Sequence, residues 1–381
     1  MKKILFVPYT FTMGGGAEKI LSLILSHLPD DKYDLSLIEL VHCEKGNEEL
    51  PTNVRELRPL IDISQRNIWN KFRNNIIIFL LYFLPSTVRL LLWSKERYDI
   101  VVSFNYLTPS IFASTFPSRK KISWVHGSIE DLDYRHYKNI WKKIKIFIFY
   151  FAQKRVFKKT DAIVVVSKKT YDSVINIFPF AKHKTRIIYN GFNFEQLIKN
   201  SSLKTVNKSK LRIIALGRLE EQKNFSLIIN SANILKSKLD FELLILGDGD
   251  IRIELQELIT RLKLDDVVKL MGYVKNPYPY ILSSDIICVS SFSEGFPTVI
   301  AEGMILGVPF VSTNIGGASE LSCGNTCGLI AGSSTEEYAA AIFQLLSNNH
   351  LRGEMSNKCK REIRKYSIEN QIEIIQQLFD I

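Results

Sequence analysis

Short apolar runs alternate with helix-like segments twice along this 381-residue chain, and this alternation most constrains how the chain can fold. In the first half we expect a helix over residues 17–27 and strands at 4–7, 33–41, 100–104, 121–125 and 162–166. In the second half we expect strands at 211–216, 241–246, 268–271, 286–290 and 309–312. Strands that alternate with helices form parallel sheets with helices on both faces. The sequence therefore predicts an α/β protein with two Rossmann-like, doubly wound domains.

A polar segment rich in Lys and Ser, residues 199–210, separates these two halves. A chain of 381 residues is also longer than a single core usually serves. We therefore predict an N-terminal domain over 1–198, a linker over 199–210 and a C-terminal domain over 211–365. The last residues, 366–381, are expected to end the chain in a helix.

The positive charge of the chain is concentrated in its first half. Residues 1–190 hold 30 Lys and Arg against 17 Asp and Glu, a net charge of +13, so the remainder carries −2 of the total of +11. A basic half predicts contact with an anionic surface, such as phospholipid, a polyprenyl phosphate or nucleic acid. We expect no nucleic-acid partner, because the chain has no helix-turn-helix, RNP-type or zinc-finger pattern.

Residues 140–157 mix Trp, Ile and Phe with Lys and Arg, which predicts a helix that lies in a membrane interface. The alternative is an ordinary core helix with a solvated face. The apolar run 76–84 is too short to span a bilayer, which needs about 20 residues. Five scattered cysteines fit a reducing compartment. We therefore expect a cytoplasmic protein that is peripheral on the inner face of the cell membrane.

Two carboxylates stand eight positions apart across a predicted strand-to-helix junction. Glu294 lies in the loop, and Glu302 lies in a helix whose first turn suits Pro297. Free backbone N–H groups at a helix start favour a phosphate, and carboxylates accept hydrogen bonds from sugar hydroxyls. For either carboxylate alone, a solvated surface position is the commoner role. Together with the residues around them, they predict a sugar-nucleotide site.

Three further elements follow predicted strands. Arg218 and Lys223 come after the strand that ends near Gly217, where two fixed cations can neutralise a leaving diphosphate. The loop 13–18 holds three glycines before a helix, so its backbone can approach a ligand closely. His126 directly follows the strand ending at 125. Taken singly, each of these is also compatible with an ordinary loop, turn or packed residue.

These motifs resemble the retaining glycosyltransferases of family 4, which have the two-domain GT-B fold, over nearly the whole chain. The matching residues are Glu294, seven residues and Glu302, and Gly217-Arg218, four residues and Lys223. The resemblance implies two domains facing a cleft, with the C-terminal helix crossing back to the first domain. It also implies that Glu294 contacts the donor sugar, that Glu302 holds the ribose, and that His126 lies near the reacting carbon.

The resemblance identifies Arg218, Lys223, Glu294 and His126 as candidate catalytic residues. Candidate donor-binding residues are Gly15, Gly16, Gly217, Tyr273, Val274, Gly295, Phe296, Pro297, Thr298, Val299 and Glu302. We expect no metal ion and no cofactor, since the UDP-sugar is the donor substrate and the two cations act where a metal would.

The expected activity is transfer of a hexose or N-acetylhexosamine from a nucleotide diphosphate sugar, such as a UDP-sugar, to a saccharide acceptor. We expect a polyprenyl-diphosphate-linked acceptor, in cell-surface polysaccharide or glycan biosynthesis. Two alternatives stay open: a sugar-nucleotide epimerase of similar fold, and a non-catalytic glycosyltransferase-like binding subunit. Product analysis separates the first of these, because an epimerase needs no acceptor.

Overall fold

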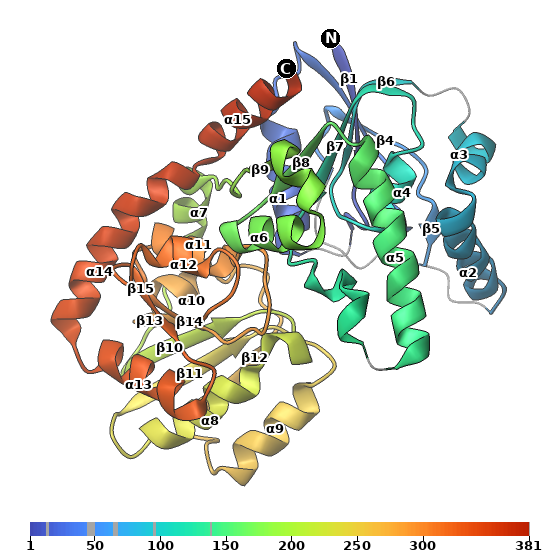
Figure 1. The fold of residues 1–381 in the computed structure, drawn as a ribbon. Helices are drawn as coiled ribbons and strands as arrows, with labels where there is room; N and C mark the ends of the chain where they lie inside the picture. Colours follow the sequence, from blue (N-terminus) through green and yellow to red (C-terminus); the bar gives the residue numbers. More distant parts are fainter. Residues whose placement is uncertain (13–14, 44–49, 64–67, 94–96, 138, 381) are drawn as a thin grey trace. The chain divides into compact units, whose positions relative to one another are not determined.

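The computed structural model describes residues 1–12, 15–43, 50–63, 68–93, 97–137 and 139–380. Its internal contacts divide the chain into two compact units, the first Met1–Gly191 with Ile368–Ile381 and the second Phe192–Ser367 (Figure 1). The division follows Gly191, whereas we predicted 198 as the last residue of the first domain. Helix α7 (Phe194–Ser201) accordingly belongs to the second unit and extends into the predicted linker.

The first unit is built on a parallel sheet of seven described strands, in the order β4-β2-β1-β6-β7-β8-β9. The strands are β1 (Lys2–Val7), β2 (Tyr33–Leu37), β4 (Val54–Glu56), β6 (Tyr98–Ser103), β7 (Ser118–Val125), β8 (Ala162–Val165) and β9 (Thr185–Ile187). Their central residues are almost entirely buried, because helices cover the sheet.

The segment 33–41, predicted as one strand, is divided in two. Strand β2 ends at Leu37, and β3 (Val41–His42) pairs instead with β5 (Ile61–Asp62) in a separate two-stranded sheet. Between them the carboxylate of Glu39 is turned into the protein, where it binds the backbone that follows β1. This buried polar contact interrupts the apolar run.

The helices of the first unit are α1 (Gly16–His27), α2 (Ile68–Phe83), α3 (Pro85–Trp93), α4 (Thr108–Ala113), α5 (Ile140–Lys159), α6 (Lys168–Ile177) and the C-terminal α15 (Ile368–Asp380). Helix α15 is held by Gln371 Oε1, which accepts a hydrogen bond from the Gly191 N–H at 3.0 Å. Lys2 also pairs with Asp380 at 2.7 Å. No helix of the described residues is both long and apolar enough to cross a membrane.

The second unit holds a parallel sheet of six described strands, in the order β12-β11-β10-β13-β14-β15. The strands are β10 (Leu211–Leu216), β11 (Phe241–Leu246), β12 (Val268–Gly272), β13 (Ile286–Val289), β14 (Phe310–Thr313) and β15 (Gly328–Ala331). The helices are α7, α8 (Phe225–Leu235), α9 (Arg252–Arg261), α10 (Tyr278–Leu282), α11 (Thr298–Ile305), α12 (Ala318–Ser322), α13 (Thr335–Leu346) and α14 (Asn349–Glu362).

The ends of β10 and β11 approach each other closely at the carboxyl edge of this sheet. Gly247 has φ +138°, and a Cβ atom there would lie 1.9 Å from the carbonyl oxygen of Gly217. Only glycine permits this approach. Two parallel α/β units are thus present, as predicted, and each places the loops that follow its strands along one edge.

Candidate functional site

Lys223 and Glu294 come together in the second unit, from the loops that follow β10 and β13. Lys223 Nζ lies 2.6 Å from Glu294 Oε1, and the Ser291 hydroxyl donates to the same oxygen at 2.7 Å. Both charged side chains are partly buried. A hydrogen-bonded ion pair of this kind is held more firmly than one on an open surface.

The backbone of the two loops is joined by further hydrogen bonds. The Ser290 hydroxyl donates to the carbonyl oxygens of Lys223 and Asn224, at 2.8 and 2.9 Å. The Phe292 N–H donates to the carbonyl oxygen of Gln222 at 2.9 Å. The positions of Lys223 and Glu294 are therefore set by the main chain as well as by their own contact.

Arg218, the other predicted cation, lies in the same loop but in a different environment. Its side chain is 66% exposed and pairs with Glu220 at 3.1 Å. Each of the two cations thus has a carboxylate partner. A diphosphate that binds here would compete with a carboxylate at each cation.

The segment from Glu294 to Glu302 has the predicted loop-to-helix form. Glu294 is in the loop, Pro297 directly precedes α11, and Glu302 is buried within that helix. The ring of Phe296 packs at centroid distances of 6.4 Å on Phe192 and 5.5 Å on Tyr366. A donor at this segment would therefore meet the backbone of Phe296 rather than its ring.

The remaining predicted donor residues of this unit differ in exposure. Gly295 and Pro297 are buried, whereas Gly217, Thr298 and Val299 are partly exposed. Tyr273 is exposed just beyond β12, and Val274 beside it is partly exposed.

In the first unit, His126 directly follows β7. The residue as a whole is partly exposed, but its Nε2 is buried and has no hydrogen-bond partner among the described residues. The ring centroid lies 4.3 Å from that of Phe104, and the ring is nearly parallel to Trp124 at 6.1 Å. Burial lowers the pKa of His126 to about 3, so the imidazole is neutral at pH 7. A neutral ring with an unpaired nitrogen can donate or accept one hydrogen bond from a ligand.

The predicted glycine loop is described only in part. Gly15 and Gly16 lie at the start of α1, and Gly16 is exposed. Met13 and Gly14 lie outside the described residues.

A third group of polar side chains, which we did not predict, lies beside this loop. Glu39 is 1% exposed, and its Oε2 accepts hydrogen bonds from the N–H groups of Phe11 and Thr12 at 2.9 and 3.1 Å. The Thr12 hydroxyl donates to the same oxygen at 3.1 Å, and Oε1 pairs with His42 Nδ1. Glu39 thus fixes the backbone immediately before the glycine loop. The sequence signal was a lone carboxylate within an apolar run.

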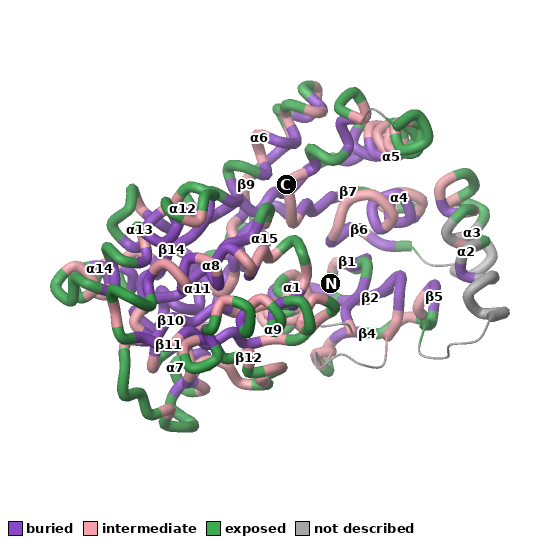
Figure 2. The backbone as a smooth tube through the Cα atoms, turned by 90° about the horizontal axis from the view of Figure 1, so that it is seen from below, coloured by how far each residue is buried: buried purple, intermediate pink, exposed green. Residues whose placement is uncertain are grey.

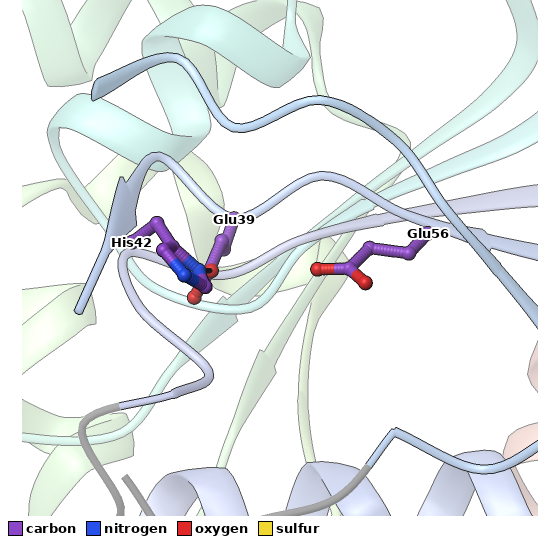
Figure 3. A group of neighbouring side chains, drawn as sticks. All are labelled: Glu39, His42 and Glu56. Atoms are coloured by element: carbon purple, nitrogen blue, oxygen red, sulfur yellow. Dashed lines mark hydrogen bonds and ion pairs between the residues drawn. The ribbon is translucent and has the colours of Figure 1, made fainter. Parts of the chain in front are cut away.

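Glu39, His42 and Glu56 each offer one atom that could bind a metal ion, and these atoms lie within 4.8 Å of one another. Figure 3 shows the three side chains. Burial acts to lower the pKa of His42, but the hydrogen bond to Glu39 and the surrounding carboxylate charges raise it above its usual value. Because both oxygens of Glu39 are already engaged, we describe this group as an anchor for the loop rather than as a metal site.

Comparisons with known proteins agree with this architecture. Residues 198–377 match the family described as "Glycosyl transferases group 1", and residues 14–196 match "Glycosyltransferase Family 4". A solved structure of HepE from Anabaena in complex with UDP is similar over 99% of both chains, with a TM-score of 0.72 and 17% identity.

Two curated relatives share more sequence identity with this chain than HepE does, but over a smaller part of their length. An uncharacterized glycosyltransferase of Methanocaldococcus jannaschii is 33% identical over 46% of this chain and 45% of its own. The N-acetylgalactosamine-N,N'-diacetylbacillosaminyl-diphospho-undecaprenol 4-alpha-N-acetylgalactosaminyltransferase of Campylobacter jejuni is 30% identical over 55% of this chain and 58% of its own. The chain thus spans about half the length of the curated relatives it matches.

The two family matches together run from residue 14 to residue 377 and meet near the division between the two units. Because both units also have the parallel α/β architecture of the similar solved structure, the chain belongs to the family 4 glycosyltransferases and has the GT-B fold.

Proposed function

We propose that this protein is a retaining glycosyltransferase that transfers a hexose or N-acetylhexosamine from a UDP-sugar to a lipid-linked saccharide in cell-surface glycan biosynthesis. The observation that carries the proposal is the Lys223–Glu294 pair, with Arg218 in the same loop at the carboxyl edge of the second sheet. This arrangement combines cations for a diphosphate with a carboxylate for sugar hydroxyls. The UDP bound to the structurally similar HepE supports the choice of nucleotide.

In the proposed reaction, the bond between the anomeric carbon and the UDP oxygen breaks as the acceptor oxygen bonds to that carbon from the same face. The acceptor proton passes to an oxygen of the departing diphosphate. Arg218 and Lys223 stabilise the charge that develops on the diphosphate, and preorganised cations of this kind typically contribute several kcal/mol. Glu294, once Lys223 turns to the phosphate, accepts hydrogen bonds from the sugar. This assignment requires no metal ion and no covalent enzyme intermediate.

The acceptor and the location are proposed from the first unit. Helix α5 carries exposed Trp141, Ile144 and Phe147 among its lysines. Much of its backbone has the colours of exposed and partly exposed residues in Figure 2. Exposed aromatic and basic residues on one helix suit an anionic membrane interface. The acceptor named for the Campylobacter relative is linked to undecaprenol, which supports a lipid-linked acceptor here. We therefore propose that the protein acts peripherally on the cytoplasmic face of the membrane.

Thermal unfolding with UDP, GDP, ADP and NAD, each with and without magnesium, tests the donor assignment, because a ligand that binds the native state raises its apparent stability. We expect a magnesium-independent shift with UDP. A shift with GDP alone would redirect the donor screen to other sugar nucleotides. A selective shift with NAD, or no shift with any nucleotide, would contradict the proposal.

Turnover of a UDP-sugar with an undecaprenyl-diphosphate-linked saccharide tests the reaction itself. We expect Lys223→Ala and Glu294→Ala to lose turnover while they stay folded. Wild-type turnover in both variants would refute the site assignment.

A further inference from the structure

Helices α2 and α5 of the first unit enclose an apolar groove of about 430 Å³. Phe79 and Phe83 of α2 line one side, with ring centroids 4.6 Å apart. Trp141, Ile144 and Ile148 of α5 line the other side. The groove therefore presents hydrocarbon and aromatic surface from two helices.

Two of the lining residues also join the helices directly. Tyr82 of α2 stacks on Phe149 of α5 at 5.1 Å, and its hydroxyl is 2.8 Å from the Thr108 hydroxyl of α4. These contacts join α2, α4 and α5 beside the groove.

The lining of the groove is unusually exposed for side chains of this size. Trp141 is 78% exposed and Phe79 is 61% exposed. The residues of α5 that are buried, Gln153, Val156 and Phe157, all lie in its C-terminal half. Exposed aromatic side chains that gather around a groove are typical of a binding site.

Positive charge lies at the groove itself. Lys145 is one of the lining residues, and its ammonium group lies 5.7 Å from the centroid of the Phe149 ring. Lys142 follows the lining residue Trp141, and its ammonium group lies 4.6 Å from the centroid of the Tyr137 ring. An occupant should therefore combine an apolar body with an anionic head.

We propose that this groove binds the prenyl chain of a polyprenyl-diphosphate-linked acceptor, with its diphosphate towards the lysines. The inference rests on the proposed function, which it deepens by naming where the lipid part of the acceptor binds. A partner helix suits the groove poorly, because one helical turn, about 10 Å across and 5.4 Å long, would already fill it. A linear prenyl chain can lie along it.

Calorimetric titration of the full chain with farnesyl diphosphate, geranyl diphosphate and inorganic diphosphate tests this. Each buried methylene strengthens binding about fourfold, so we expect farnesyl diphosphate to bind at least tenfold more tightly than geranyl diphosphate. Inorganic diphosphate should bind least. Equal affinity for all three would overturn the proposal, because only the charge would then be recognised.

Variants of exposed apolar residues test whether farnesyl diphosphate binds in the groove or to exposed apolar surface in general. Phe79→Ser and Ile144→Ser change lining residues, and each should weaken farnesyl diphosphate binding about tenfold. Ile140→Ser is the control, since Ile140 is also 61% exposed but does not line the groove. An equal loss in the control would overturn the proposal, as would binding to vesicles of anionic phospholipid with no binding of farnesyl diphosphate.

The proposed function and the groove can fail separately. Turnover of an undecaprenyl-linked acceptor that is unchanged in Phe79→Ser and Ile144→Ser would refute the groove and leave the transferase intact. Farnesyl diphosphate binding with the expected chain-length dependence, but no turnover with any UDP-sugar, would support the groove and refute the transferase.

Discussion

Replacing Glu39 should release the backbone that leads into the glycine loop. In the Glu39→Leu variant, the N–H groups of Phe11 and Thr12 lose their acceptor in a buried site, and His42 loses its partner. Each of these two unsatisfied buried donors costs about 1–3 kcal/mol, and losing the hydrogen bond to the partly exposed His42 adds about 1 kcal/mol. Allowing for the apolar surface that leucine buries, we expect a net loss of about 3 kcal/mol.

Hydrogen exchange of the peptide that holds Phe11 and Thr12 measures this loss locally, without requiring the two units to unfold together. A loss of about 3 kcal/mol corresponds to exchange about 100-fold faster. Glu39→Gln keeps one acceptor oxygen, so its exchange should rise less than tenfold. Glu56→Leu is the control, because Glu56 is exposed and makes no described hydrogen bond to this backbone.

Exchange in Glu39→Leu that stays within threefold of the wild type would refute the reasoning. It would mean that the Phe11 and Thr12 amides are protected by the surrounding chain and that Glu39 does not anchor the loop. An equal acceleration in Glu56→Leu would also refute it, since general loss of negative charge would then explain the effect.

Three other predictions concern the remaining elements. Lys223→Met and Glu294→Gln should each lower kcat/KM for the UDP-sugar about 100-fold. The double variant should have nearly the same kcat/KM as either single variant, because the effects of residues that act as a unit are not additive. Additive losses in the double variant would contradict the pairing. Gly317→Ala should destabilise the protein by about 2 kcal/mol or more in thermal unfolding, because Gly317 has φ +77° and a Cβ atom there would lie 2.7 Å from Phe296 Cδ2. Gly353→Ala is the control: Gly353 is exposed on α14, so this variant should be as stable as the wild type or more stable. Burial lowers the pKa of His126 to about 3, below its value in the unfolded chain, so the contribution of His126 to stability is complete above about pH 6.5 and is lost as the pH falls towards 3. The melting temperature of a His126→Gln variant should therefore depend less on pH between about 6.5 and 3 than that of the wild type. An unchanged pH profile would refute the assignment.

The sequence predicted those elements whose apolar runs are bounded by polar residues. Strands β10 and β11 were predicted to their exact ends, because each is a buried run between polar segments. The run 33–41 misled the prediction, since its apolar character continues through the break. What breaks it is the contact of Glu39 with the backbone after β1, which depends on how the sheet assembles. Local pattern cannot reveal a tertiary hydrogen bond.

Local sequence and tertiary packing also contribute differently to the candidate site. Lys223 and Glu294 were selected through the resemblance, and the structure brings them within hydrogen-bonding distance. Phe296 was selected in the same way, but its ring packs against Phe192 and Tyr366. A motif therefore selects a candidate segment, while the direction of each side chain depends on distant residues such as Tyr366.

The pairing of each candidate cation with a carboxylate bears on how a donor would be selected. Arg218 pairs with Glu220 and Lys223 with Glu294, so the net charge of these four side chains is zero. An isolated phosphate would gain little by displacing one carboxylate. A nucleotide diphosphate sugar offers a diphosphate for both cations and hydroxyls for the carboxylate that is released. The pairing thus favours a ligand that carries both groups, and it accounts for why Lys223 and Glu294 should act as one unit.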